Sequence, residues 1–261
     1  MDISVSTGFY YQKDYQHILD IISETDCSNI ELFLNDSFLD LSLQEISQAL
    51  QQRNLNVTSV HNPLALIVGG RKEEYWLERS IQYAQQLGAE LVVTHMSYHE
   101  QGDKKISNDR IHKQNILKYT NTDDILVCTE NLPPNDEYKS FLHTQEELYD
   151  FVQENDCCMT FDTTHWASHG RDLIKGYNLY KDYIKNIHIS DFENGNEHKI
   201  LGTGETPLDL FLKELQRDNY DGALTIEVDF AAEERNDVNN YQEAVGGLQE
   251  SLDYIYDNLN K

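Results

Sequence analysis

The chain has 261 residues, of which 39% are hydrophobic, so it can bury one sizeable core and is long enough for one large domain or two small ones. Its 46 acidic and 20 basic residues give a formal net charge of −26, which makes nucleic acids and anionic lipids poor partners but tolerates divalent cations. The N-terminal MDISVSTGFYY lacks the basic and apolar regions of a signal peptide, and no apolar run reaches the roughly 18 residues of a membrane span, so we predict a cytoplasmic protein with no membrane segment.

Short apolar runs alternate with amphipathic helical patterns from one end of the chain to the other. The strand-like runs cover residues 3–8, 29–34, 56–61, 89–95, 124–130, 157–162, 186–191 and 223–228. The helical patterns cover residues 13–24, 42–53, 72–87, 108–121, 144–154, 172–185, 207–218 and 238–259. Each predicted strand is therefore followed by one predicted helix.

Local signals mark several of the helix ends. Gly88 directly follows the third helical pattern and is a favoured C-terminal cap. Thr144 and Glu147 have the spacing of a capping box, and Pro207 stands where proline is favoured at the start of a helix.

Eight strand-helix pairs without a dividing linker favour one closed architecture. Buried parallel strands covered by helices are typical of α/β proteins, and a (β/α)₈ barrel needs about 250 residues. We therefore predict that residues 1–261 form a single (β/α)₈ TIM barrel domain, with the active site at the C-terminal ends of the strands.

The four cysteines, Cys27, Cys128, Cys157 and Cys158, form no C-x-x-C pair. Cys128 and the Cys157–Cys158 pair lie in predicted strands, where a free thiol packs as a small hydrophobe. We expect buried thiols there in preference to disulfides or metal ligands.

Acidic and imidazole side chains recur where the predicted strands end. These residues are Glu31, His61, His95, Glu130, Asp162, His188 and Glu227, and from His61 onward they stand 26 to 39 positions apart. Because the carboxyl ends of the strands meet at one mouth of such a barrel, six of them, from His61 to Glu227, should face a common point.

The chemistry of these residue types favours a divalent metal site. Glu130 and Glu227 interrupt apolar runs, and a buried carboxylate needs a cation or a proton. Asp162, His165 and His188 share the same mouth and can add oxygen and nitrogen ligands.

Other polar residues of the region are weaker candidates for metal ligands. A lone histidine at a strand end, such as His61 or His95, is more often a hydrogen-bonded loop residue than a ligand. Asp191 and Glu197 are candidates to orient a histidine from behind. Glu31 could instead pair with a neighbouring strand, and histidines in helix or loop contexts, His112 and His143 among them, are expected in solvent.

The order of nine motifs resembles a known family. The motifs are S-x-G-F, I-E-L-F, H-N-P, V-V-T-H, E-N-L-P-P, F-D-T-T-H, I-H-I-S-D, E-H-K-I-L-G-T-G and T-I-E-V. Together they look like the xylose isomerase-like TIM barrel superfamily, which includes sugar isomerases, sugar epimerases and the DNA repair enzyme endonuclease IV. Each motif is weak by itself, but the resemblance covers nearly the whole chain.

The epimerase branch of that family implies one divalent metal ion held by Glu130, Asp162, His188 and Glu227. It also implies that Glu130 and Glu227 act as an acid-base pair and that His165 binds a substrate oxygen. Such a metal would stabilise an enediolate while carboxylates move protons between carbons. Asn194 and Asp136 replace an arginine and a glutamate of some ketose epimerases, which leaves the sugar open.

The endonuclease IV branch implies three zinc ions and further ligands, which His61, His95, His165 and His198 would supply. Two departures weaken this resemblance: Asn196 stands where an aspartate ligand is expected, and Leu64 stands where a tyrosine would insert into DNA. The negative charge of the chain also disfavours binding to a duplex.

We therefore expect a metal-dependent isomerase or epimerase acting on a small sugar, polyol or hydroxy-carbonyl compound. The alternatives are a zinc-dependent phosphodiesterase of the endonuclease IV type and a barrel that binds a metal or ligand without turnover. Mn²⁺ or Zn²⁺ are the first choices of metal, and Mg²⁺ or Co²⁺ are also compatible with mixed oxygen and nitrogen ligands. The sequence leaves open the substrate, the number of ions and whether the protein forms an oligomer.

Overall fold

The fold places eight parallel strands in a closed barrel. The computed structural model describes residues 1–39, 41–63, 72–101, 104–120, 125–232 and 236–259, so that Leu64 lies outside the described residues. The barrel strands are β1 (Asp2–Ser6), β2 (Asn29–Phe33), β3 (Asn56–His61), β4 (Leu91–Thr94), β7 (Leu126–Glu130), β8 (Met159–Asp162), β9 (Ile184–Ile189) and β12 (Ala223–Ile226). β1 pairs in parallel with both β2 and β12, which closes the barrel and confirms the predicted fold class.

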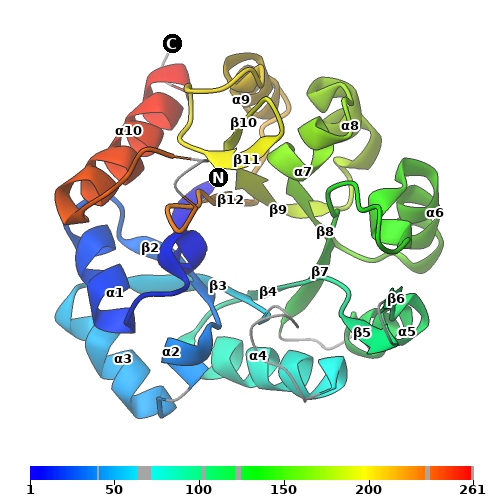
Figure 1. Ribbon diagram of the computed structural model, residues 1–261, viewed down its shortest axis with the longest axis horizontal. Coiled ribbons are helices and arrows are strands. Elements are labelled where there is room, and N and C mark those ends of the chain that lie inside the picture. The colour runs from blue at the N-terminus through cyan, green and yellow to red at the C-terminus, as the bar shows by residue number, and fades with distance from the viewer. Residues whose placement is uncertain (40, 64–71, 102–103, 121–124, 233–235, 260–261) are drawn as a thin grey trace.

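Helices follow the strands and form an outer ring around the barrel (Figure 1). The longer ones are α1 (Tyr15–Ser23), α3 (Leu43–Gln52), α4 (Glu73–Leu87), α5 (Asp109–Tyr119), α6 (Gln145–Asn155), α8 (Leu173–Tyr180), α9 (Leu208–Arg217) and α10 (Tyr241–Leu259). α10 packs against both α9 and α1, so the last helix closes the ring beside the first. Among the described helices, none combines the length and the apolar character that a membrane span requires.

Several short elements lie between the predicted strands and helices or overlap the end of a predicted strand. They are the helices α2 (Asp36–Leu39) and α7 (Thr163–Ser168), two 3₁₀ turns (Thr7–Tyr10 and Phe141–His143), and the hairpins β5–β6 (Tyr98–Gln101, Lys104–Ser107) and β10–β11 (Asp191–Glu193, Asn196–Lys199). The turn of the second hairpin is Asn194-Gly195, and both residues have positive φ. Asn-Gly is the strongest short hairpin signal, so the sequence did carry this information.

The helix ends agree with some of the local signals. Gly88 caps α4 in the left-handed conformation with φ of 80°, and Pro207 directly precedes α9. The capping box predicted at Thr144 is wrong, because its side chain accepts no capping hydrogen bond and its hydroxyl donates to the carbonyl of Ser140. A complete capping box forms at Ser42 and Glu45 instead.

The side chains inside the barrel divide into a polar and an apolar sector. Glu31 on β2 accepts a hydrogen bond from Asn186 on β9, and these strands are not neighbours in the barrel, so the contact crosses its interior. The apolar sector contains Leu91, Val93 and Cys128, against which Cys158 packs. The barrel interior beneath the candidate metal-site residues is therefore polar on one side and apolar on the other.

All four thiols are free, as expected for cysteines that pack as hydrophobes. Cys27, Cys128 and Cys157 are buried, and Cys158 is half-buried with its Sγ 2.7 Å from that of Cys128. Cys157 and Cys158 directly precede β8, whereas the predicted strand included them.

A buried ion pair joins α4 and α5 to the segment that follows β4. Glu73, the first residue of α4, accepts hydrogen bonds from the backbone and the hydroxyl of Ser97 and from Asn115. Nδ1 of His112 lies 2.9 Å from the same carboxylate, and its Nε2 lies 2.9 Å from the hydroxyl of Thr129 on β7. His112 is thus buried, against the expectation of a solvated side chain, because it links two helices to a strand.

Burial raises the pKa of the Glu73 carboxyl, but His112 and the hydrogen-bond donors outweigh it and lower that pKa to about 2. We therefore expect Glu73→Gln to lower the free energy of unfolding at pH 7 by about 3 kcal/mol, measured by urea denaturation. A lowered pKa stabilises the fold above the unfolded value near 4.5, so the difference from the wild type should shrink as the pH falls from 4.5 towards 2.

Glu74→Gln is the matched control, because the neighbouring Glu74 is exposed and pairs with Lys118. It should change the free energy of unfolding by less than about 1 kcal/mol. Equal effects of the two substitutions, or a Glu73→Gln difference that does not vary with pH, would contradict a structural role for the buried pair.

Candidate metal centre and active site

Six of the candidate residues lie at the carboxyl ends of the barrel strands, whereas His165 lies on α7 and His198 on β11. Glu130, Asp162 and His61 are the last residues of β7, β8 and β3, and His188 is the last but one of β9. His95 and Glu227 directly follow β4 and β12. Because the strands are parallel, these ends open on one mouth of the barrel, and the side chains converge there.

Glu130, Asp162, His188 and Glu227 form a group with one potential ligand atom each, all within 4.8 Å of one another. We call these residues the four-residue ligand group. Nδ1 of His188 lies 2.7 Å from Oε2 of Glu227, 3.0 Å from Oε1 of Glu130 and 3.9 Å from Oδ2 of Asp162. These contacts are comparable with the spacing between ligand atoms that each lie about 2.0–2.2 Å from one shared cation.

The carboxylate oxygens of this group fit a bound cation. Oδ2 of Asp162 is buried and accepts no hydrogen bond, which is costly for a carboxylate oxygen, and Oε2 of Glu227 is paired with Nδ1 of His188 at 2.7 Å. The other oxygen of Asp162 caps α7 by accepting from the backbone N–H of His165, which turns Oδ2 towards the group. Three carboxylates facing one imidazole leave excess negative charge that a divalent ion would neutralise.

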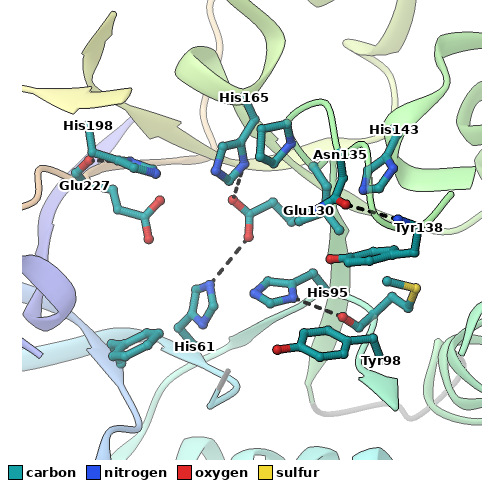
Figure 2. A pocket seen from close by; sticks show the side chains of 14 residues that line it. His61, His95, Tyr98, Glu130, Asn135, Tyr138, His143, His165, His198 and Glu227 are labelled. Atoms are coloured by element: carbon teal, nitrogen blue, oxygen red, sulfur yellow. Dashed lines mark hydrogen bonds and ion pairs between the residues drawn. The ribbon is translucent and has the colours of Figure 1, made fainter. Parts of the chain in front are cut away.

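Four further histidines surround the ligand group. His61 and His95 stand on one side with Glu130, and His165 and His198 stand on the other with Asp162, each trio having potential ligand atoms within 4.8 Å. Figure 2 shows the Glu130 carboxylate between His61 and His165, with Glu227 and His198 beside it. The structure thus brings together the eight residues predicted as metal ligands or substrate contacts, which are His61, His95, Glu130, Asp162, His165, His188, His198 and Glu227.

These four histidines share one orientation. Nδ1 of each lies beside a backbone carbonyl: 2.7 Å from Asn62 for His61, 3.4 Å from Met96 for His95, 2.9 Å from Asn131 for His165 and 3.0 Å from Glu227 for His198. An Nδ1–H that donates to a carbonyl leaves Nε2 available to a ligand in the pocket. His188 has the opposite orientation, since its Nδ1 faces the ligand group and its Nε2 faces Glu31.

The charges of the site shift its pKa values in opposite directions. Burial raises the pKa of Asp162 to about 6. Burial disfavours the charged form of His165, but Asp162 and Glu130 outweigh it and raise the pKa of His165 to about 9. Burial lowers the pKa of His95 to about 4, because the charge of Glu130 offsets only part of the effect and His61 acts in the same direction as burial. At neutral pH the mouth therefore holds a cationic His165 and a neutral His95.

His188 is the electrostatic centre of the ligand group. Burial acts against its charged form, yet Glu227, Glu31 and Glu130 together raise the pKa of His188 well above its usual value. Burial likewise opposes ionisation of Glu130 and Glu227, and the adjacent His188 outweighs it and lowers the pKa of both carboxyls. A proton on Nδ1 of His188 thus occupies the position that a metal ion would take.

A cavity of about 370 Å³ opens above these groups. Its lining includes the apolar side chains of Met96 and Leu132, and Figure 2 shows the rings of Tyr98 and Tyr138 on the side of His95. The rings of Tyr98 and Tyr138 stack with centroids 5.5 Å apart. Of the described residues that line the cavity, none is a lysine or an arginine.

No motif of the sequence indicated that Tyr98 and Tyr138 form an aromatic wall of the cavity. Tyr98 belongs to hairpin β5–β6, and Tyr138 lies in the segment between β7 and α6, and both residues lie outside the predicted strands and helices. His143, expected in solvent, also lines the cavity. Only the stacking of two distant segments on each other gives these residues a common role, and no local pattern signals that contact.

The two residues proposed to orient a histidine have different surroundings. The Asp191 carboxylate accepts hydrogen bonds from the backbone N–H groups of Gly202, Gly204 and Thr206, so it fixes the loop after β11. Glu197 is half-buried on the same hairpin as His198, and its charge contributes to the raised pKa of His165. Neither carboxylate therefore forms a direct hydrogen bond to the imidazole ring of a candidate metal ligand.

His198 is held by its backbone. Its φ of 57° is in the left-handed region, and its carbonyl accepts hydrogen bonds from the backbone N–H of Asp229 and from the side chain of Asn236. A non-glycine residue in this conformation is strained unless its surroundings hold it. The β10–β11 hairpin therefore carries His198 to the pocket in a fixed position.

Comparisons with known proteins agree with this architecture. Residues 12–257 match the family described as xylose isomerase-like TIM barrel. An uncharacterized protein of Methanocaldococcus jannaschii is 24% identical over 254 residues, covering 91% of this chain and 92% of the relative. A D-psicose 3-epimerase structure determined in the presence of D-fructose is similar over 100% of both chains, with a TM-score of 0.76 and 14% identity. An AP endonuclease of family 2 from Brucella melitensis has a TM-score of 0.70 and 15% identity, covering 88% of this chain and 94% of that chain.

Because His188 holds a proton where a cation would bind, metal binding should release protons. We expect the affinity for Mn²⁺ to rise about tenfold per pH unit for each proton released between pH 6 and 8. Calorimetric titration in buffers with different ionisation enthalpies measures the number of protons. Affinity that does not change with pH would show that the ion binds elsewhere, and Glu74→Gln serves as a surface control.

Proposed function

This chain belongs to the xylose isomerase-like TIM barrel family, and we propose that it is a metal-dependent isomerase or epimerase of a small sugar, polyol or hydroxy-carbonyl compound. The observation that carries the proposal is the four-residue ligand group, in which Glu130 and Glu227 both reach the cavity while sharing His188 as a neighbour. The proposal also treats residues 1–261 as one functional domain, since the ring of elements runs from β1 to α10.

Glu130, Asp162, His188 and Glu227 would hold the ion in this proposal. When bound, the metal would polarise a substrate carbonyl and its neighbouring hydroxyl as a Lewis acid. Mn²⁺ and Zn²⁺ suit three carboxylates and one imidazole, and Mg²⁺ and Co²⁺ are also compatible.

The side chains of the pocket would supply the proton transfers. Glu130 and Glu227 are the only carboxylates among the described residues that line the cavity. Both are ionised at neutral pH because their pKa values are lowered, so either can accept the proton from the substrate C–H. The other must first take up a proton from solvent in the open cavity before it can return one to carbon, and the first then releases its proton to solvent. His165, with its pKa raised to about 9, is positively charged at neutral pH and can donate a hydrogen bond to an oxygen on which negative charge develops.

The composition of the pocket favours an uncharged substrate. The cavity lining lacks lysine and arginine among the described residues, and the net charge of −26 repels anions, so a phosphorylated sugar is disfavoured. The aromatic wall at Tyr98 and Tyr138 suits the carbon-rich part of the substrate, away from the carboxylates.

A second candidate is an endonuclease IV-like phosphodiesterase. The observation in its favour is that His61 and His95 with Glu130, and His165 and His198 with Asp162, form two further potential ligand trios. Three features argue against a DNA backbone as substrate: Asn196 in place of an expected aspartate ligand, the lack of lysine and arginine among the described lining residues, and the negative net charge.

Two cheap measurements separate these candidates. Elemental analysis of the purified protein should find one metal ion per chain for the isomerase or epimerase and two or three for the phosphodiesterase. A duplex with an abasic site should remain intact in the first case and be cut in the second.

Substitution of the acid-base pair tests turnover. We expect Glu130→Gln and Glu227→Gln each to lower kcat by about 10²–10⁴-fold, because each removes a group that moves a proton. The measurement is NMR-detected exchange of substrate C–H for deuterium across a panel of unphosphorylated ketoses and polyols. Glu193→Gln, which removes a surface ion pair with Lys199 on hairpin β10–β11, should leave the rate unchanged.

The non-catalytic alternative has a distinct outcome in the same experiment. A barrel that only binds a metal or ligand would show no C–H exchange in the wild type, while Glu130→Gln would still weaken metal binding. Exchange that is equally fast in the wild type and in both glutamine variants would exclude these carboxylates as the acid-base pair.

A further inference from the structure

Glu31 is a carboxylate buried at the base of the metal centre, on the side away from the cavity. It lies on β2, has no exposed surface, and its two oxygens are 3.1 and 3.2 Å from Nε2 of His188. Oε2 also accepts hydrogen bonds from Ser59 at 2.8 Å and from Asn186 at 3.2 Å. Glu31 touches the ring of a ligand-group residue but does not line the cavity.

The burial of this carboxylate requires a reason. Desolvation of a carboxylate costs several kcal/mol unless a cation or good donors compensate it. The ion-pair partner of Glu31 among the described residues is His188, and no lysine or arginine forms an ion pair with it. Barrel interiors of this type are usually filled by branched apolar side chains, so a glutamate here is costly for packing alone.

The geometry of His188 explains what the carboxylate does. With Nε2–H donating to Glu31, the other ring nitrogen, Nδ1, faces Glu130, Glu227 and Asp162, and it offers a lone pair to a cation once its own proton is released. The four surrounding histidines instead have a ring nitrogen beside a neutral carbonyl. A charged acceptor fixes the tautomer more strongly than a carbonyl and makes the ligating nitrogen a better electron donor.

We propose that Glu31 is a positioning residue, which holds His188 with Nε2 protonated and thereby strengthens the binding of a divalent cation at Nδ1. The proposal rests on the proposed function only in that both need a metal ion at the four-residue ligand group. Glu31 itself neither contacts the ion nor lines the cavity.

A network across the polar sector of the barrel keeps Glu31 in place. Asn186, which donates to Glu31, accepts a hydrogen bond at its Oδ1 from Thr225, and the hydroxyl of Thr225 lies 3.0 Å from that of Ser4. These residues come from β9, β12 and β1, so several strands fix the position of one carboxylate. A side chain held from so many elements is suited to orient a ring within the tolerance that metal binding needs.

The first test compares metal affinities without using activity. We expect Glu31→Gln, which keeps the shape of the side chain but removes its charge, to weaken Mn²⁺ binding about 10–100-fold in calorimetric titrations and in titrations followed by electron paramagnetic resonance. Ser59→Ala is the matched control, because it removes another contact of the same carboxylate but leaves that of His188, and it should change the affinity less than about threefold.

A double substitution separates positioning from long-range attraction. If Glu31 acts through His188, Glu31→Gln should have no further effect on Mn²⁺ affinity in a His188→Gln background. An unchanged loss of affinity in that background would mean that Glu31 merely adds negative charge near the cation, and would overturn the proposal.

The tautomer of His188 can be read in the unaltered protein, so the proposal stays testable if the variants fail to fold. In the Zn²⁺-loaded protein, nitrogen-15 NMR should show Nε2 of His188 protonated and Nδ1 bound to the metal. Metal bound at Nε2, or a Glu31→Gln variant that binds Mn²⁺ as tightly as the wild type, overturns the inference. A wild-type protein that binds no divalent ion at the ligand group would instead overturn the proposed function.

Discussion

The structure depends on the interaction of four acidic side chains, three of them buried and Glu227 half-buried, with a single imidazole. Glu130, Asp162 and Glu227 face one edge of the His188 ring, and Glu31 faces the other. In water such charges would be screened, but in the barrel each must be matched locally. The arrangement is tolerable with a proton on His188 and is better balanced with a divalent cation, so the charge of the centre links its stability to its occupant.

The rest of the fold keeps those groups in place. The parallel strands bring their ends to one mouth, Asp162 caps α7, and the β10–β11 hairpin carries His198. Further from the centre, Glu73 ties α4 and α5 to the segment that follows β4 and His95. In the Asp162 and Glu73 contacts, a buried carboxylate accepts hydrogen bonds that position the backbone around it. This agrees with the rule that binding sites need rigid support.

Much of this could be predicted from the sequence, for identifiable reasons. The eight strand-helix pairs have clear periodicity, and in a barrel that periodicity alone forces Glu130, Asp162 and His188 to the same end. Tyr98 and Tyr138 could not be found in this way, because their stacking depends on how two irregular connections meet in space. His112 looked like a helix-surface residue, yet it is buried because α5 packs against Glu73 and Thr129. The tautomer of His188 likewise depends on Glu31, a residue 157 positions away along the chain.

The division of the barrel interior has a consequence for how this protein can evolve. Leu91, Val93 and Cys128 meet through non-directional contacts, so substitutions that conserve volume there should cost less than about 1.5 kcal/mol and accumulate readily. Across the axis, Ser4, Asn186 and Thr225 are joined by directional bonds, and replacing one leaves its neighbours without partners. Divergent descendants would therefore drift on the β4–β7–β8 side and retain their ancestral residues on the β1–β12–β9 side.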